Sequence, residues 1–251
     1  CVEITHGNLS HLVAWHIGAF GVTAADRGSC LAGLGFDASV WEIWPYLSVG
    51  ASVSLIDDMT RIDPVLLQRW LVDCGITISF VPTPVAEPLM AMDWPAGTRL
   101  RTLLTGGDTL HTVPKESLPF EVVNNYGPTE CTVVATSGRV EPNTTGLPSI
   151  GRPISDTSIY LLDDRKQPVP SGQMGEIYIG GNGVGRGYRN LPDLTAQVFL
   201  PDPFASRPDC RMYKTGDWAS RLPDGQLSFH GRSDNQEKIR GNRIELDEIV
   251  S

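Results

Sequence analysis

The chain has 251 residues, 41% apolar and 20% charged, so it can bury a sizeable core, and neither a disordered chain nor a small disulfide-stapled scaffold is expected. Its formal net charge of −9 disfavours the broad basic surface that non-specific nucleic-acid binding requires. No apolar run approaches the roughly 18 residues of a membrane span. The start, Cys1-Val2-Glu3-Ile4, lacks the basic region of a secretory signal. We therefore expect a cytoplasmic protein that binds neither nucleic acid nor membrane.

Cysteine and histidine spacing gives no sign of a metal site. The five cysteines are scattered without a C-x-x-C pair, which disfavours a disulfide framework and a zinc knuckle. His6, His11 and His16 recur every five residues, a spacing that spreads side chains around a helix. Buried free thiols are the simpler expectation, and a metal site built from histidines is not expected.

The first part of the chain alternates helix-like and strand-like segments. Thr5 predicts the cap of a helix that runs to about Ile17, and Asp63-Pro64 opens another that Gly75 closes. Short apolar runs between and after them have the length and β-branched content of buried strands: 51–56, 76–81, 100–104 and 120–123. This alternation predicts an α/β layer.

From about Gly151 the pattern changes to short strands separated by turns. Segments 158–162, 175–179 and 226–230 alternate with Asp-Asp, Pro-Ser-Gly and Pro-Asp-Gly turns, which is typical of a small antiparallel unit. The densely charged tail from Asp234 is a third piece. We therefore expect an α/β part over residues 1–150, a β-rich part over 151–232 and a short third piece over 233–251.

Three segments concentrate groups that suit a nucleotide. Residues 124–130 follow an expected buried strand, where α/β sheets place their ligands, and offer an aromatic face in Tyr126, a close-approach glycine in Gly127, a hydroxyl in Thr129 and a carboxylate in Glu130. Asp217 lies just beyond a glycine turn and could accept hydrogen bonds from ribose hydroxyls. The stretch 231–246 mixes glycines with charges of both signs. Taken singly, the first two are more readily explained as a Gly-Pro turn and a turn aspartate, and the third has the alternative of a solvated connector.

Taken in order, five segments resemble the core motifs of nonribosomal peptide synthetase adenylation domains, over nearly the whole chain: 36–42, 124–130, 175–188, 213–217 and 231–246. The resemblance implies the adenylate-forming fold, in which an α/β sheet layer precedes a small distorted β-barrel. It also implies a reaction: an amino acid and ATP with Mg²⁺ give an aminoacyl adenylate, which the phosphopantetheine thiol of a carrier domain then captures. Carrier and condensation domains of the same synthetase are the implied partners.

The resemblance assigns roles residue by residue. It gives catalytic roles to Thr129 and Glu130, with Glu130 on Mg²⁺, and makes Asp234 the hinge of the C-terminal subdomain. The implied nucleotide contacts are Tyr126 on adenine, Gly107, Asp217 on ribose, Phe229 and Arg232. The family's phosphate loop is expected immediately before Val2, and its catalytic lysine after this stretch, so we expect the fragment alone to be nearly inactive. The overall resemblance suggests a bacterial assembly line for an antibiotic or toxin, such as a microcystin-type synthetase.

The resemblance also implies which residues line the amino-acid pocket: Asp37, Ala38, Trp41, Phe80, Leu104, Gly106, Asn125, Val133 and Val134. Asp37 is the only charged member, which suits the substrate ammonium and leaves no partner for a charged side chain. Leucine is the expected substrate, and valine and isoleucine follow closely because one methylene discriminates by only about 1–3 kcal/mol.

Helical spacing near Asp37 gives a partial check of this pocket. It puts Val40, Ile43, Trp44 and Leu47 on one apolar stripe and Trp41 on a neighbouring face that could line a pocket. By residue type alone, Trp41 is more readily explained as a core residue.

Two other functions stay open. The first is an adenylate-forming ligase for aryl or fatty acids, against which Asp37 argues because such substrates carry no amine. The second is a non-catalytic binding fragment, which the absent phosphate loop and lysine would favour.

Overall fold

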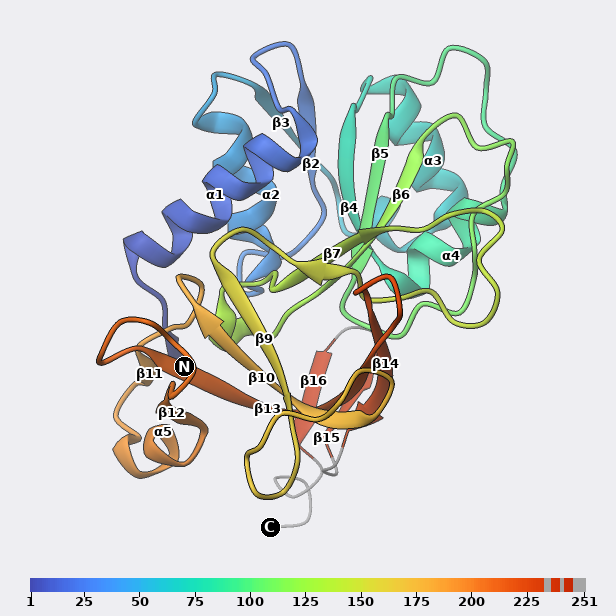
Figure 1. Cartoon of the computed structure of the whole chain (residues 1–251). Coiled ribbons are helices and arrows are strands. Elements are labelled where there is room, and N and C mark those ends of the chain that lie inside the picture. The colour runs from blue at the N-terminus through green and yellow to red at the C-terminus, as the bar shows by residue number, and fades with distance from the viewer. Residues whose placement is uncertain (233–235, 240–241, 246–251) are drawn as a thin grey trace. The chain divides into compact units, whose positions relative to one another are not determined.

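The computed structural model describes residues 1–232, 236–239 and 242–245, which form two compact units (Figure 1). One, here called the parallel-sheet unit, comprises Val13–Asn125 and Gly138–Pro148. The other, the antiparallel-sheet unit, comprises Cys1–Leu12, Tyr126–Ser137 and the chain from Ser149. These units are discontinuous in sequence, and the expected boundaries after residues 150 and 232 stay predictions. Among the described residues, no helix has the length and apolar character to cross a membrane.

The parallel-sheet unit is built on five parallel strands in the order β3-β2-β4-β5-β6. Their bounds are β2 Arg27–Cys30, β3 Ser52–Leu55, β4 Ile78–Pro82, β5 Thr102–Gly106 and β6 Glu121–Tyr126. The helices are α1 His6–Phe20, which belongs to this unit from Val13 on, α2 Ala38–Leu47, η1 Thr60–Ile62, α3 Pro64–Asp73 and α4 Thr83–Ala91. Helix α2 lies beside β2 and β3, and α3 and α4 lie beside β4 to β6 (Figure 1). The predicted α/β layer is confirmed.

The caps of two helices follow the local sequence. The Thr5 hydroxyl accepts the Asn8 backbone N–H at 3.1 Å, and the Asn8 amide oxygen accepts the Thr5 N–H at 2.9 Å, so the two residues form a reciprocal capping box. The Asp63 carboxylate accepts the N–H groups of Val65 and Leu66 at the start of α3. Both predicted helices are confirmed.

Two strand predictions were wrong in detail. Residues 51–56 were expected to form a buried strand, but β3 is half-buried to exposed because it is the last strand of the sheet and pairs only with β2. The strand expected over 120–123 runs on as β6 to Tyr126, so Asn124, Asn125 and Tyr126 belong to the strand instead of following it. The first half of the 124–130 motif is therefore held by the parallel ladder with β5.

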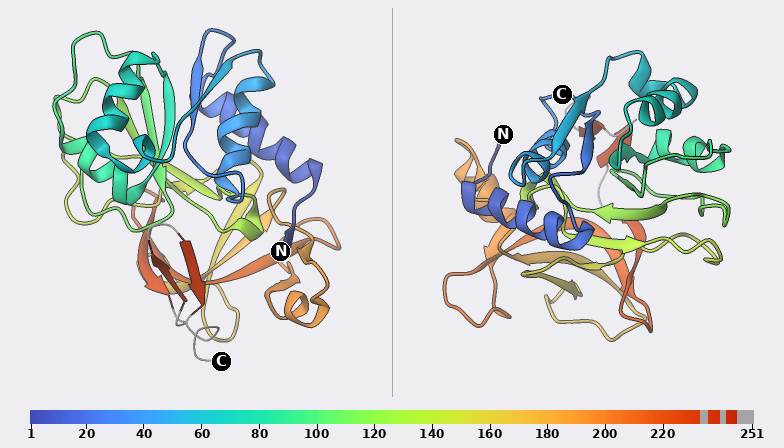
Figure 2. Two further views of the ribbon diagram at one scale, coloured as in Figure 1. Left: turned by 180° about the vertical axis from the view of Figure 1, so that it is seen from behind. Right: turned by 90° about the horizontal axis from the view of Figure 1, so that it is seen from above.

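The antiparallel-sheet unit contains the predicted β-rich segment. Its main sheet has the order β12-β13-β10-β9, with β14 also on β13, and Figure 2 shows it from behind and from above. The bounds are β9 Thr157–Leu162, β10 Met174–Gly181, β12 Phe199–Pro201, β13 Arg211–Arg221 and β14 Leu227–Arg232. The remaining elements are β1 Val2–Glu3, η2 Thr129–Cys131, β7 Thr136–Arg139, β8 Arg152–Pro153, β11 Gly187–Tyr188, α5 Pro192–Val198, β15 Gln236–Ile239 and β16 Asn242–Glu245.

Each unit has its own apolar core. In the parallel-sheet unit, side chains from α3, α4 and the strands, including Leu67, Leu71, Leu89 and Leu103, are fully buried. In the antiparallel-sheet unit, Ile177 of β10 and Leu227 of β14 are fully buried in a second cluster.

Candidate functional site

Four of the five expected nucleotide residues come together in the antiparallel-sheet unit. The Tyr126 hydroxyl donates to Oδ2 of Asp217 at 2.6 Å, and the Arg232 guanidinium donates to Oδ1 of the same carboxylate at 2.8 Å. The rings of Tyr126 and Phe229 lie 6.1 Å apart between centroids. Burial and the Asp217 charge raise the pKa of Tyr126 well above its usual value, so the phenol stays a donor.

Strand geometry explains how these residues meet. β13 has an irregularity in its pairing with β14 between Asp217 and Ala219, just after Gly216 in the left-handed region at φ 76°. Asp217 is thereby opposite Arg232, and Ala219 is opposite Phe229. The Arg232 guanidinium also donates to the Thr215 carbonyl at 3.1 Å, which fixes its direction. Asp217 is thus held by Tyr126 and Arg232, and a carboxylate is the type of group that accepts ribose hydroxyls.

The fifth expected nucleotide residue, Gly107, is exposed and lies in the parallel-sheet unit just after β5, at φ 87°. Asp234, the expected hinge, lies outside the described residues.

Thr129 and Glu130 begin the short helix η2 and differ sharply in exposure. Thr129 is exposed, whereas Glu130 is 1% exposed and its carboxylate accepts the Tyr188 hydroxyl at 2.6 Å. The Glu130 backbone carbonyl accepts the N–H of Gly185, which ties η2 to the glycine-rich segment before β11. The carboxylate oxygens of Glu130 are ligands that fit Mg²⁺, because Mg²⁺ binds through one or two carboxylates together with substrate phosphates. Tyr188 was not predicted to touch Glu130.

The turn after η2 contains strain that the sequence did not indicate. Thr132 and Val133 both have positive φ, 60° and 70°, and the Val134 N–H donates to the Thr132 carbonyl at 2.8 Å. A bond between residues two apart around a positive φ makes Val133 the centre of a classic γ-turn, a rare conformation for a β-branched residue. Gly127 was expected to let the backbone approach a ligand. In the structure, a Cβ there would lie 2.4 Å from the Val133 carbonyl oxygen, so the glycine accommodates this turn.

Four expected pocket residues lie in the parallel strands, Phe80 and Leu104 midway along theirs and Gly106 and Asn125 at or near the carboxyl ends. Phe80 pairs in register with Leu104, and Gly106 with Asn125. A Cβ on Gly106 would lie 2.3 Å from the Asn125 carbonyl oxygen, so only glycine fits. The Asn125 amide donates to the carbonyls of Thr105 and Val123, and no described residue hydrogen-bonds its buried Oδ1. Of the nine pocket positions, only Val133 and Val134 belong to the antiparallel-sheet unit.

The predicted apolar stripe of helix α2 is not its buried face. Trp44 and Leu47 are about half exposed, whereas Trp41 is 2% exposed. The Trp41 indole donates to His16 Nδ1 at 2.8 Å, and its ring lies 5.1 Å from that of Phe80. A polar contact from α1 and the Phe80 ring therefore decide which face of α2 is covered. Trp41 and Phe80, two expected pocket positions, are in contact.

Glu42, also on α2, is a buried carboxylate that the sequence did not single out. It is 2% exposed, and its two oxygens accept the N–H groups of Leu31 and Ala32 at 2.9 and 2.8 Å. Burial raises its pKa to about 7. The carboxylate joins α2 to the end of β2, and so helps to hold the loop that leads to Asp37 at the start of the helix.

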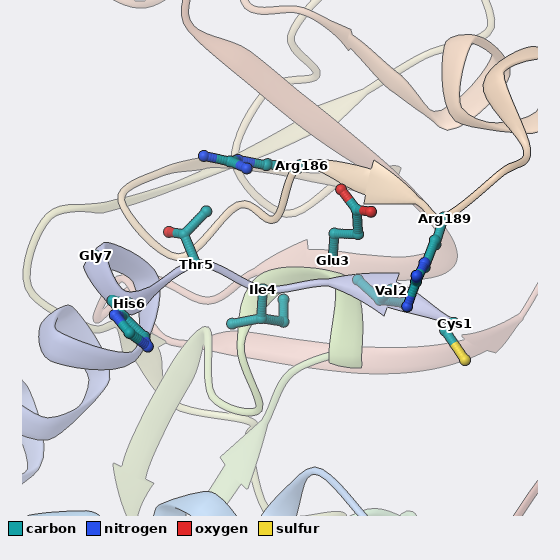
Figure 3. Close-up of a pocket in the computed structure, with 9 residues that line it drawn as sticks. All are labelled: Cys1, Val2, Glu3, Ile4, Thr5, His6, Gly7, Arg186 and Arg189. Atoms are coloured by element: carbon teal, nitrogen blue, oxygen red, sulfur yellow. The ribbon is translucent and has the colours of Figure 1, made fainter.

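A hollow of about 660 Å³ opens beside β1 and β11 (Figure 3). Residues 1–7, Arg186 and Arg189 line it, and the Arg189 side chain points toward Val2 and Cys1. None of the expected site residues lines this hollow. Within the part of the chain that the structure describes, no three His, Cys, Asp or Glu side chains form a metal-binding group.

The sequence of the chain matches a known protein family. The family described as AMP-binding enzyme matches residues 1–189, and the chain belongs to it. A linear gramicidin synthase from Brevibacillus parabrevis is 54% identical over all of this chain but over 5% of its own length. Bacitracin synthase 1 of Bacillus licheniformis is 47% identical over 99% of this chain and 5% of its own. The chain therefore spans a small part of these relatives.

Solved structures of similar fold also match this chain. PA1221, described as an NRPS protein containing adenylation and PCP domains, has a TM-score of 0.84 at 29% identity and covers 99% of this chain and 51% of its own. IdnL1 has a TM-score of 0.85 at 30% identity over 99% of this chain and 53% of its own. The fold is the adenylate-forming fold, as the sequence motifs implied, and the chain resembles nonribosomal peptide synthetase adenylation domains.

Proposed function

We propose that the chain is the central part of an ATP-dependent adenylating ligase that activates an amino acid for nonribosomal peptide synthesis. The observation that carries this proposal is the cluster of Tyr126, Asp217, Phe229 and Arg232 in one unit. It presents two aromatic rings, a carboxylate and a guanidinium from segments far apart in the sequence. Such a set can take a base, a ribose and negative charge together.

The residues of the chain supply binding and orientation for this reaction. A substrate carboxylate oxygen forms a bond to the α-phosphorus of ATP, the bond to the pyrophosphate oxygen breaks, and pyrophosphate leaves with that electron pair. Tyr126 and Phe229 pack near adenine, Asp217 accepts ribose hydroxyls, and the exposed Thr129 hydroxyl donates to a phosphate oxygen. Glu130 would hold Mg²⁺, which offsets phosphate charge when bound.

For the substrate we propose leucine, with valine and isoleucine as close competitors. Asp37 pairs with the substrate ammonium, and Trp41, Phe80 and Leu104 offer apolar surface to its side chain. A specific observation supports a second candidate: the buried Asn125 Oδ1 has no hydrogen-bond partner among the described residues and favours a side chain that carries a donor, such as that of glutamine. An aryl- or fatty-acid ligase is the remaining enzyme alternative.

The partners that we propose are a carrier domain and a condensation domain. The adenylate would pass to the phosphopantetheine thiol of a carrier domain, and a condensation domain of the same cytoplasmic synthetase would use the product. Asp234 would be the hinge for the change between the two steps. Residues 1–150, 151–232 and 233–251 would be the pocket part, the β-barrel part and the start of the moving subdomain.

The test uses what we call the completed domain, meaning this chain joined to the phosphate loop and the lysine-bearing subdomain that the family resemblance places around it. Amino-acid-dependent ATP–pyrophosphate exchange should be strongest with leucine. Asp37→Ala should abolish it, and Asp58→Ala, a control at an exposed aspartate, should leave it unchanged. A preference for glutamine would move the proposal to the second candidate. Full activity of Asp37→Ala, or exchange with an aryl or fatty acid only, would overturn the amino-acid proposal.

A further inference from the structure

His16 is a buried histidine that the proposed reaction does not use. It lies on α1, is 1% exposed, and its ring packs against those of Phe20 and Tyr46 at centroid distances of 4.8 and 5.4 Å. Its Nδ1 accepts the Trp41 indole N–H at 2.8 Å, so Nδ1 carries no proton. Burial, together with the charge of Arg101, lowers its pKa to about 3, which keeps the ring neutral and able to accept.

Stability alone does not account for a histidine at this position. Because Nδ1 is the acceptor, the ring proton is on Nε2, and no described residue hydrogen-bonds that buried nitrogen. A buried donor without a partner costs about 1–3 kcal/mol, so an apolar ring of similar size would suit this aromatic cluster better. The contact that accounts for a histidine at this position is therefore its hydrogen bond with the Trp41 indole.

The Trp41 ring has His16 at its polar edge and Phe80 beside it. His16 meets the indole edge-on at an interplanar angle of 89°, whereas Phe80 lies at 5.1 Å and 52°. The indole has a single hydrogen-bond donor, and His16 takes it. What remains of Trp41 for a neighbouring ligand is carbon surface.

We infer that His16 is a specificity-determining positioning residue, which binds the Trp41 indole N–H and so leaves only apolar indole surface for the amino-acid pocket. This inference rests on the proposed function and adds a residue outside the nine pocket positions. A pocket wall without a hydrogen-bond donor does not stabilise a substrate side chain that carries an acceptor oxygen. Such a substrate loses its hydration and gains no hydrogen bond in return.

The test compares two substrates that differ in one atom group: norvaline and O-methylserine, in which an ether oxygen replaces a methylene. Their ratio of kcat/KM in ATP–pyrophosphate exchange is measured for the completed domain. His16→Phe keeps a ring but removes the acceptor, so the indole N–H can turn to an ether oxygen, and the preference for norvaline should fall about tenfold. His16→Gln restores an acceptor and should keep the wild-type ratio.

Two further measurements separate this role from a general loss of structure. The Trp41 indole N–H resonance, assigned with Trp41→Phe, should shift in His16→Phe and stay near its wild-type position in His16→Gln. Adding Trp41→Phe to His16→Phe removes the donor and should return the substrate ratio toward the wild-type value. If His16→Phe does not fold, His16→Met replaces it as the variant without a comparable acceptor.

The outcomes separate the inference from the proposed function. Leucine activation with an unchanged norvaline preference, in a folded variant whose indole resonance has shifted, overturns the inference alone. A lowered ratio in both His16→Phe and His16→Gln also overturns it, because the acceptor would then be irrelevant. A completed domain that activates no amino acid overturns the proposed function, and the inference falls with it.

Discussion

The phenol of Tyr126 and the carboxylate of Asp217, 91 residues apart in the sequence, are joined by a hydrogen bond of 2.6 Å. Asp217 is 5% exposed and also binds Arg232, so its two oxygens are held from two sides. The arrangement fixes the plane of the tyrosine ring as well as the direction of the carboxylate. Both are needed if one residue packs on a base while the other accepts ribose hydroxyls.

Tyr126→Phe tests this coupling, because it keeps the ring and removes the hydroxyl. A hydrogen bond to a charged group contributes about 1.5–3 kcal/mol, so the KM for ATP should rise about tenfold or more, with little change in the KM for the amino acid. Steady-state exchange kinetics on the completed domain measure both values. Tyr160→Phe is a matched control, since Tyr160 binds Asp202 at 3.2 Å in the same unit. Equal effects of the two changes would contradict a role at the nucleotide site.

How far the sequence could predict these features depends on the range of each contact. The caps at Thr5 and Asp63 join residues two or three apart, so local patterns predicted both helices. Motif order supplied the fold class and the identities of Tyr126, Asp217 and Arg232. It could not supply their mutual hydrogen bonds, because these depend on strand register and on the irregularity after Gly216.

The features that the sequence did not indicate also depend on contacts between distant segments. Periodicity along α2 showed one apolar stripe, but the buried face of a helix is decided by what packs on it. His16 on α1 and Phe80 on β4 lie far from α2 in the sequence. Buried polar partners such as His16 for Trp41, or the Leu31 and Ala32 N–H groups for Glu42, leave no periodic signal.

His16 should make stability fall in acid. Its folded-state pKa of about 3 is below the ordinary 6.5, so the unfolded chain binds the proton first and stability is lost as pH falls below about 6.5. At about pH 4.5 this contribution amounts to about 3 kcal/mol. Urea unfolding of His16→Gln, compared with the completed domain at several pH values, should lack this contribution. His6→Gln, at an exposed position of the same helix, should retain it. Identical pH profiles for His16→Gln and the wild type would contradict the burial argument.

Glu42 should have the opposite effect. Its folded-state pKa of about 7 is above the ordinary 4.5, so the unfolded chain loses the proton first and stability falls as pH rises from about 4.5 to 7. The full contribution is about 3 kcal/mol. Between about pH 4.5 and 6.5 it offsets that of His16. Glu42→Gln should therefore become more stable, relative to the wild type, as pH rises through this window. Glu87→Gln, at a more exposed carboxylate, is the control. A difference from wild type that does not vary with pH would contradict the assignment.

Because Val133 is the strained centre of a γ-turn, we predict that removing its side chain costs almost no free energy of unfolding. A strained residue of this kind costs about 1–3 kcal/mol, and glycine adopts a positive φ without penalty. The glycine adds about 0.5–1 kcal/mol of backbone entropy to the unfolded chain, so Val133→Gly should keep the wild-type free energy of unfolding within about 1 kcal/mol. Val134→Gly is the matched control. Val134 is 2% exposed and has no positive φ, so the same change should cost about 3 kcal/mol or more. Urea unfolding of both variants measures the difference, and equal losses would show that the turn at Val133 stores no strain.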